Sequence, residues 1–325
     1  MRLGRSAGAS DPGRRRRRNE DSYVVEPPLF AVADGMGGAQ AGEIASKLAA
    51  GAVTSGGEDV ETLIQEANRR VHQRSLEDEA ASGMGTTLTV ASVESEIVRI
   101  GHVGDSRAYL VRGGSLEQLT QDHSLVAELV RTGRLSPEEA EGHPQRSVIT
   151  RALGTDPDVD VDTFAIEPKP GDLFLLCSDG LTSMIGDEAI LDLVEEQRDD
   201  LQGLVKGLIK AANKGGGEDN ITVVAFEIDG DTDREDVEET QTLPAASAVE
   251  PQRDQDDEDT LTEADRVPAV ETMIVSADEI AAAYEQPQPT PPRRRRRFLS
   301  RLLAFVLVIA LLCAIVLFSV WGLTR

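Results

Sequence analysis

Four short motifs place carboxylates at the ends of apolar runs. In chain order they are Asn19-Glu20-Asp21, Asp34-Gly35-Met36-Gly37-Gly38, Ser178-Asp179-Gly180 and Gly217-Glu218-Asp219-Asn220. Residues 29–33 run into Asp34, residues 173–177 run into Asp179, and Asp219 leads into residues 221–226. Carboxylates with no His or Cys cluster nearby suit hard divalent cations such as Mg²⁺ or Mn²⁺ better than zinc. The motifs therefore predict a site for such cations.

Each motif taken singly has a plainer structural interpretation. An Asp-Gly pair such as Asp34-Gly35 is typical of a tight turn, because glycine adopts positive φ at little cost. Asn19-Glu20-Asp21 fits a solvated loop, and Asp219-Asn220 fits a turn with Asx capping. The occurrence of all four in one order favours a shared site over four unrelated turns.

The elements that must position these carboxylates can be read from periodicity. Apolar residues from Val60 to Val71 and from Leu201 to Ala212 recur at the spacing of one helical face, and residues 42–53 form a third, Ala-rich helical stretch. Strands are expected at residues 86–93, 97–103, 107–111, 172–177 and 221–228. Paired helices and runs of strands favour a layered α+β fold over regular βαβ alternation.

Composition separates the chain into regions. The 325 residues have room for one large domain or two ordinary ones, and a net charge of −25 argues against nucleic-acid binding. Between Asp229 and Glu285 there are 19 acidic residues against three arginines. We expect residues 229–292 to be an acidic, disordered linker, because they cannot bury enough apolar surface to offset the entropy of ordering.

The C-terminal residues predict a membrane anchor. Residues 302–323 contain no charged side chain, and a helix rising about 1.5 Å per residue would span a hydrocarbon core of about 30 Å. A basic segment, residues 293–301, precedes this run, so the positive-inside rule places the large N-terminal part in the cytoplasm. Residues 1–10 lack the apolar segment of a secretory signal. Cys177 and Cys313 lie in separate apolar runs, which favours a reducing compartment.

Residues 10–228 resemble the type 2C metal-dependent Ser/Thr protein phosphatases in their bacterial form, the PPM family. Besides the four motifs, the matching segments are Gly85-Thr86-Thr87, Gly104-Asp105-Ser106-Arg107, Asp122-His123-Ser124 and Thr150-Arg151-Ala152-Leu153-Gly154. The resemblance implies a two-sheet β-sandwich flanked by antiparallel helix pairs, in α-β-β-α layers. Within the family, the chain looks most like the membrane-anchored members that oppose eukaryotic-type Ser/Thr kinases. Phosphorylated proteins, kinases among them, are therefore the expected partners.

The resemblance also implies the cofactors and their ligands. Asp34 would bridge two Mn²⁺ or Mg²⁺ ions, with the Gly35 carbonyl on one and Asp179 and Asp219 on the other. Two cations about 3.5–4 Å apart acidify a bridging water and neutralise phosphoryl oxygens during in-line displacement. No nucleophilic side chain and no phosphoenzyme are then required.

Further positions receive roles in the same way. Glu20 and Asp21 would hold metal-bound waters, and Asp105 and Ser147 match positions that, with Asp179, hold a third cation. The family's phosphate-binding arginine lies three residues before the Asn of the first motif, which selects Arg16 from the run of arginines at residues 14–18. The planar guanidinium suits this task because it can meet two phosphoryl oxygens at once.

Other residues differ from the eukaryotic pattern or have structural interpretations. Met36 stands where eukaryotic members carry a His, and a thioether cannot donate a proton to the leaving group. We interpret His72, His102, His123 and His143 as structural rather than catalytic. Residues 132–147 correspond to the family's flap over the active site, where substrate selection is expected.

The sequence is also compatible with two alternatives to a working phosphatase. One is a pseudophosphatase that keeps the fold without turnover, against which the intact Asp34, Asp179 and Asp219 speak. The other is an adaptor in which phosphorylated threonines of the acidic linker (Thr240, Thr260 and Thr272) recruit a phosphothreonine-binding domain. A plain acidic spacer is the simpler interpretation of that linker.

Overall fold

The computed structural model describes residues 2–37, 41–56, 59–78, 81–230 and 273–274. The predicted membrane helix (residues 302–323), the basic segment before it (293–301) and nearly all of the predicted linker (229–292) lie outside these residues. Within the described ranges, no helix combines the length and apolarity needed to cross a membrane.

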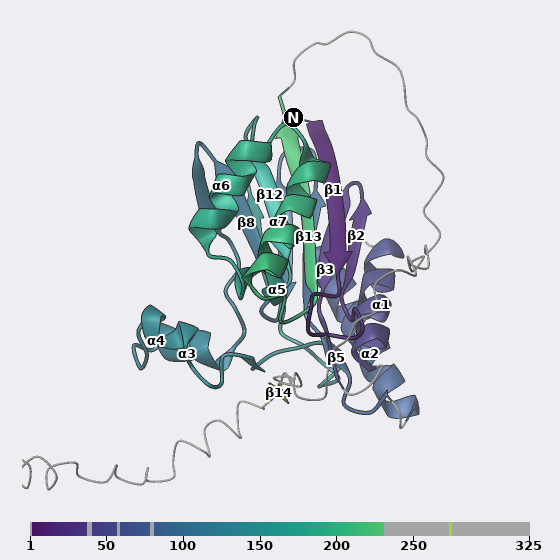
Figure 1. The fold of residues 1–325 in the computed structure, drawn as a ribbon. Coiled ribbons are helices and arrows are strands. Elements are labelled where there is room, and N and C mark those ends of the chain that lie inside the picture. Colours follow the sequence, from purple (N-terminus) through teal and green to yellow (C-terminus); the bar gives the residue numbers. More distant parts are fainter. Residues whose placement is uncertain (1, 38–40, 57–58, 79–80, 231–272, 275–325) are drawn as a thin grey trace, which may run out of the picture. The chain divides into compact units, whose positions relative to one another are not determined.

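Two antiparallel sheets form the centre of the described part of the chain (Figure 1). The first has the spatial order β1 (Arg2–Asp11), β13 (Ile221–Asp229), β12 (Leu173–Cys177), β8 (Arg107–Arg112) and β9 (Ser115–Gln118). The second has the order β11 (Asp162–Ile166), β7 (Val98–Val103), β6 (Leu88–Val93), β3 (Leu29–Ala33) and β2 (Ser22–Glu26). Short pairs join β4 (Gly35–Met36) to β5 (Gly85–Thr86), and β10 (Val148–Ile149) to β14 (Met273–Ile274).

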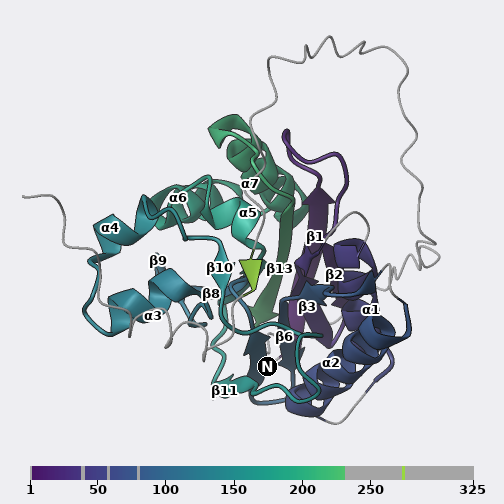
Figure 2. The same ribbon diagram turned by 90° about the horizontal axis from the view of Figure 1, so that it is seen from below.

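A pair of helices covers the outer face of each sheet. The helices of the second sheet are α1 (Ala41–Thr54) and α2 (Val60–Glu77), and those of the first are α6 (Asp187–Gln197) and α7 (Leu201–Gly215). The short α5 (Asp179–Thr182) follows β12, and α3 (Leu125–Arg131) and α4 (Pro137–Glu141) project away from the sandwich (Figures 1 and 2). The α-β-β-α layers and the α+β class agree with the prediction.

Three apolar layers hold the sandwich together. The layer between the sheets contains stacked rings, with centroids of Phe30 and Phe226 4.2 Å apart and of Phe174 and Phe226 5.0 Å apart. The outer layers bury the helical faces predicted from periodicity, Val60 to Val71 in α2 and Leu201 to Ala212 in α7. Burial of these faces, rather than intrinsic helix propensity, is what stabilises such helices.

The structure adds elements that the sequence patterns did not predict. β1 begins at Arg2, so the sheet extends N-terminally beyond the domain start expected at Ser10. Only Ala7 of β1 is buried, so no apolar alternation reveals the strand. The expected strand at residues 86–93 is interrupted at Thr87, which divides it into β5 and β6. Helix α3 is capped by Ser124, and α4 begins with a capping box from Ser136 to Glu139.

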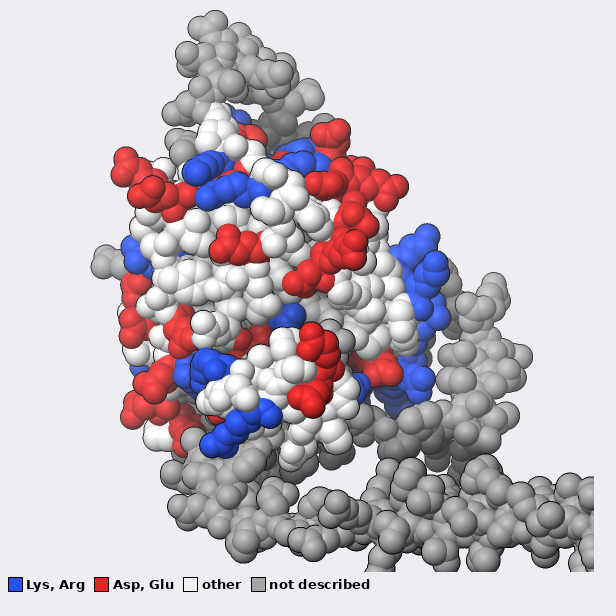
Figure 3. Space-filling view, turned by 90° about the vertical axis from the view of Figure 1, so that its left-hand side faces the viewer, with Lys and Arg blue, Asp and Glu red and all other residues white. Residues whose placement is uncertain are grey.

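Charges of both signs are interspersed over the protein face seen in Figure 3. Residues 1–228 contain 39 acidic and 23 basic side chains, a net charge of −16, and residues 229–285 have the same net charge of −16. The predicted catalytic-domain part of the chain is therefore itself strongly acidic.

Candidate metal centre

The predicted carboxylates meet at one end of the sandwich, and both sheets contribute to them. Asp34 follows β3 of the second sheet, and Asp105 lies in the connection from β7 to β8. Asp179 begins α5 directly after β12, and Asp219 precedes β13 of the first sheet. Because β12 and β13 are neighbouring antiparallel strands, the end of one and the start of the other lie together.

Main-chain contacts fix the turn that carries Asp34. The Asp34 carbonyl accepts hydrogen bonds from the Thr86 hydroxyl at 2.8 Å and the Thr87 N–H at 2.9 Å. The Asp34 N–H donates to the Thr87 hydroxyl at 2.9 Å, and that hydroxyl lies 2.8 Å from the Ser106 hydroxyl. Thr87 thereby connects the Asp34 turn to the turn that carries Asp105.

Two glycines are required because main chain packs against main chain at this end. A Cβ on Gly35 would lie 2.2 Å from the Gly42 carbonyl oxygen and 2.5 Å from that of Glu20. A Cβ on Gly180 would lie 2.0 Å from the Asn220 carbonyl oxygen. Any side chain at Gly180 would therefore force Asp179 and the Asp219-Asn220 loop apart.

Asp179 has an unsatisfied buried oxygen. Its Oδ1 is buried and has no hydrogen-bond partner among the described residues. Burial, followed by repulsion from Asp219, raises the pKa of Asp179 to about 6. Burial also raises the pKa of Asp34 well above its ordinary value, and Asp21 and Asp179 add to this shift. The mutual repulsion shows that these carboxylates share one small region.

Asp21 lies behind this group and is nearly inaccessible. Its Oδ2 accepts hydrogen bonds from the Thr222 hydroxyl at 2.6 Å and the Ser178 hydroxyl at 2.9 Å, while its buried Oδ1 has no partner among the described residues. Burial raises the pKa of Asp21 to about 7. Burial also raises the pKa of Glu20, against an opposing effect of the Arg16 charge.

Asn220 has a role that the sequence analysis missed. Its side-chain carbonyl accepts from the Glu20 N–H at 2.8 Å. Its side-chain amide donates to the carbonyls of Pro12 at 3.0 Å and Arg18 at 2.8 Å. Asn220 therefore ties the N-terminal loop to the start of β13. An Asx turn at Asp219-Asn220 involves only neighbouring residues, so that interpretation could not predict these long-range contacts.

Arg16 belongs to the site in the described structure. Its Nη2 donates to Asp219 Oδ2 at 2.8 Å, and about a quarter of each side chain is exposed. The guanidinium is thus placed among the carboxylates, as the choice of Arg16 from the arginine run requires. Its contact with phosphate stays a prediction.

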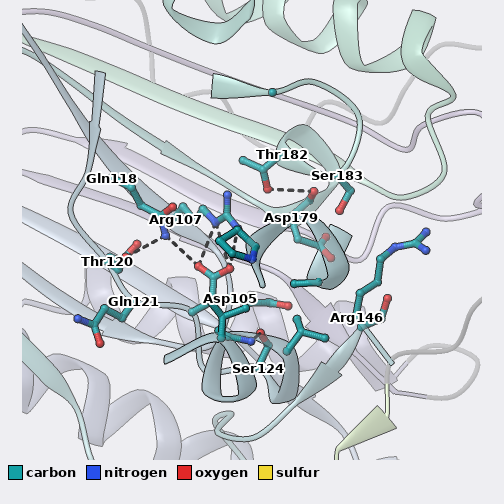
Figure 4. A pocket seen from close by; sticks show the side chains of 18 of the residues that line it. Asp105, Arg107, Gln118, Thr120, Gln121, Ser124, Arg146, Asp179, Thr182 and Ser183 are labelled. Carbon is teal, nitrogen blue, oxygen red and sulfur yellow. Dashed lines mark hydrogen bonds and ion pairs between the residues drawn. The ribbon is translucent and has the colours of Figure 1, made fainter. Parts of the chain in front are cut away.

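Asp105, Ser147 and Asp179, the predicted ligands of a third cation, all line one cavity of about 850 Å³ (Figure 4). The cavity extends from the carboxylates toward α3 and α4, and Arg146 of the predicted flap also lines it. Burial and repulsion from Asp179 raise the pKa of Asp105 well above its ordinary value. Arg146 lies 3.5 Å from Glu218 and so connects the flap to the loop that carries Asp219.

The histidines and Met36 have packing or hydrogen-bonding roles. The His123 ring accepts a hydrogen bond at Nδ1 from the Gly104 N–H at 3.0 Å, and the main-chain N–H of His123 donates to the Gly104 carbonyl at 2.7 Å. These two bonds hold the turn before Asp105. His102 is fully buried and bonded to Thr89. His72 contacts the Gly154 carbonyl, and His143 accepts from the Gln145 N–H. Met36 packs with Ile149 and Ala152.

The chemistry of the residues present fits divalent cations. Among the described residues, no three His, Cys, Asp or Glu side chains form a group that could hold a metal ion by themselves. Asp219 Oδ2 accepts a hydrogen bond from Arg16 Nη2 at 2.8 Å. Clustered carboxylates with raised pKa values and two unpartnered buried oxygens nevertheless call for positive charge. The Gly35 carbonyl and water would complete the ligand set.

Comparisons with known proteins agree with this arrangement. The family model described as "Protein phosphatase 2C" matches residues 16–221. The serine/threonine phosphatase stp of Listeria welshimeri is 41% identical over 236 residues, which cover 67% of this chain and 93% of the relative. The serine/threonine protein phosphatase PstP of Mycobacterium tuberculosis is 37% identical over 319 residues, 94% of this chain and 58% of the relative. The crystal structure of a PstP catalytic domain in complex with two manganese ions has a TM-score of 0.65 and 37% identity, covering 70% of this chain and 99% of that one.

Proposed function

Because this chain belongs to the protein phosphatase 2C family of metal-dependent Ser/Thr protein phosphatases, we propose that Asp34, Asp179 and Asp219 hold its catalytic Mn²⁺ or Mg²⁺ ions. In this proposal Asp34 contacts both cations and the Gly35 carbonyl contacts one of them. The substrates are phosphoserine and phosphothreonine in proteins.

The convergence of acidic groups at one end of the sandwich supports the proposal. Oδ1 of Asp179 and Oδ1 of Asp21 are buried without a partner among the described residues, and the pKa values of both groups are raised by burial. An anionic cluster of this kind is unfavourable unless cations offset it. Bound there, Mn²⁺ or Mg²⁺ would supply an acidified water as nucleophile and positive charge against the phosphoryl oxygens.

The protein's own side chains have distinct tasks in this reaction. Arg16 orients the phosphoryl group, and to do so it gives up or shares its contact with Asp219 Oδ2. Asp21 and Glu20 accept hydrogen bonds from ordered waters and thereby hold them in place. Met36 is buried and has no proton to donate, so the serine or threonine leaving group takes its proton from water.

Turnover of p-nitrophenyl phosphate and of a phosphothreonine peptide, with and without Mn²⁺, tests the proposal. We expect Asp34→Ala to abolish both activities at saturating Mn²⁺, because the residue contacts both cations. Asp192→Ala, which removes an exposed carboxylate of α6, serves as the matched control and should retain full activity. Substantial turnover by Asp34→Ala would show that Asp34 is not the bridge.

We propose further that the phosphatase is tethered to a membrane with its catalytic domain in the cytoplasm, where it opposes Ser/Thr kinases. The support is the uncharged run at residues 302–323 and the arginines at residues 293–297 before it. The similarity to PstP over 94% of this chain extends beyond the catalytic domain and is consistent with a shared tail.

A further inference from the structure

A strand from the acidic stretch after the catalytic domain pairs with the domain itself. β14 (Met273–Ile274), the yellow-green arrow in Figure 2, lies beside β10 (Val148–Ile149). The two strands are parallel, with Val148 opposite Met273 and Ile149 opposite Ile274. Composition predicted no structure there, and the pairing joins segments far apart in the sequence. Parallel pairing of two short segments indicates that β10 offers main-chain groups to an added strand.

β10 lies beside the metal centre and the cavity. Ser147, the residue before β10, lines the cavity together with Asp105 and Asp179. Ile149 packs against Met36, which follows Gly35. Ile149 also forms an antiparallel bridge with Ser124, the residue that caps α3. β10 is thus anchored at Ser124, the N-cap of α3, while β14 pairs along it.

The direction of the pairing determines on which side of the paired residues the phosphorylated residue of a bound peptide would lie. In a parallel pair both strands run the same way, so residues that precede the paired ones in a bound peptide would extend toward Ser147 and the cavity. A peptide in this register would carry its phosphorylated residue immediately before the paired residues. The phosphate would then approach the carboxylate-rich end of the cavity, where Asp179 lies.

We propose that the edge of β10 binds the polypeptide of phosphoprotein substrates as an added parallel strand, and that β14 occupies this edge as an intramolecular competitor. The inference rests on the proposed phosphatase function and concerns how that function selects its substrates. Main-chain pairing recognises an extended backbone rather than one side chain, so the residues after the phosphorylated one must be able to extend and to pair. Proline at a paired position is excluded because it lacks an N–H donor.

N-methylated peptides test the docking mode directly. The parent peptide contains phosphothreonine followed by Met-Ile-Val, and single N-methyl groups are placed at the first or the second residue after phosphothreonine. At least one of these two changes should lower kcat/KM about fivefold or more, because it removes a main-chain hydrogen bond and blocks close pairing. A peptide N-methylated two residues before phosphothreonine is the control. If neither change after phosphothreonine lowers kcat/KM by more than about twofold, the docking mode is wrong.

A variant of the full chain tests the competition. Ile274→Pro removes an N–H from β14, and Ala264→Pro introduces a proline outside the paired residues as the control. We expect Ile274→Pro to lower KM for the phosphopeptide about threefold or more, because a tethered competitor acts at high effective concentration. Kinetics with p-nitrophenyl phosphate, which has no backbone to pair, should not change. An unchanged peptide KM would overturn the competition.

The same measurements separate the two hypotheses. If the unmodified chain shows no Mn²⁺-dependent turnover of p-nitrophenyl phosphate, the proposed function is contradicted. Normal turnover of that compound together with equal use of all the methylated peptides contradicts only strand docking at β10.

Discussion

Asp21→Asn should make the metal-free protein more stable relative to the wild type as pH rises. The substitution keeps an oxygen for the hydroxyls of Ser178 and Thr222, which donate to Oδ2 at 2.9 and 2.6 Å. The new amide nitrogen takes the place of Oδ1, the atom with no partner among the described residues. The change therefore removes a buried negative charge while conserving the two hydrogen bonds.

The magnitude follows from the pKa of Asp21. Burial raises this pKa from its ordinary value of 3.8 to about 7 in the folded protein. A raised carboxyl pKa means that stability is greatest below pH 3.8 and is lost as pH rises to about 7, where the folded protein also ionises. The loss is about 1.4 kcal/mol per pH unit, and about 4 kcal/mol above pH 7. An orphaned amide costs about 1–3 kcal/mol, but that cost does not vary with pH.

Urea unfolding in EDTA at pH 5, 6, 7 and 8 measures this effect. The free energy of unfolding of Asp21→Asn minus that of the wild type should increase by about 2–3 kcal/mol from pH 5 to pH 7 and then level off. Asp192→Asn, at an exposed position of α6, should follow the wild type at every pH. A difference between Asp21→Asn and wild type that stays constant from pH 5 to pH 8 would refute the reasoning.

Manganese should narrow the difference in stability between Asp21→Asn and the wild type. Cations that bind only the folded state stabilise it in proportion to the logarithm of their concentration over Kd. Asp21→Asn should gain less from Mn²⁺ than the wild type does, because the residue is assigned to hold waters around the cations. An equal gain in both proteins would remove Asp21 from the metal centre.

Three further outcomes are expected. Arg16→Ala should raise KM for phosphopeptides and modestly lower kcat, so that the loss in kcat/KM corresponds to about 1.5–3 kcal/mol. A larger effect of Arg14→Ala in the same steady-state assay would show that the wrong arginine was chosen. Asp105→Asn should bind two Mn²⁺ ions tightly in calorimetric titration yet turn over phosphopeptides much more slowly, whereas unchanged kcat and stoichiometry would make it a turn residue. Deleting residues 293–325 should move a fully active enzyme from the membrane fraction to the soluble fraction, and a non-aggregated protein that stays in the membrane pellet would contradict the anchor.

Local patterns in the sequence predicted the elements whose signals lie within a single window. The apolar faces of α2 and α7 are read from a spacing of three and four residues, and both faces are buried as expected. The ends of β3 and β12 are marked by Asp34 and Ser178-Asp179, because an apolar strand stops where a polar turn begins. The order of the motifs also indicated the family, which the family model confirms.

Strands that are stabilised by partners distant in the sequence could not be predicted from local sequence patterns. β1 is a half-buried edge strand, and it forms because β13, more than two hundred residues later, offers an unpaired edge. Residues 273–274 lie in an acidic stretch of disordered composition, yet they pair with β10. Neither strand has an apolar alternation that a local pattern could detect.

The sequence by itself determined which residue types are available for a metal centre and in which order they occur. Tertiary structure alone decided their chemistry. Asp219 forms an ion pair with Arg16, and Asn220 connects the N-terminal loop to β13. Asp21 is buried and accepts hydrogen bonds from Ser178 and Thr222. Charge, burial and hydrogen bonding act through space over a few ångströms, so the raised pKa values of this cluster exist only once both sheets bring their strand ends together.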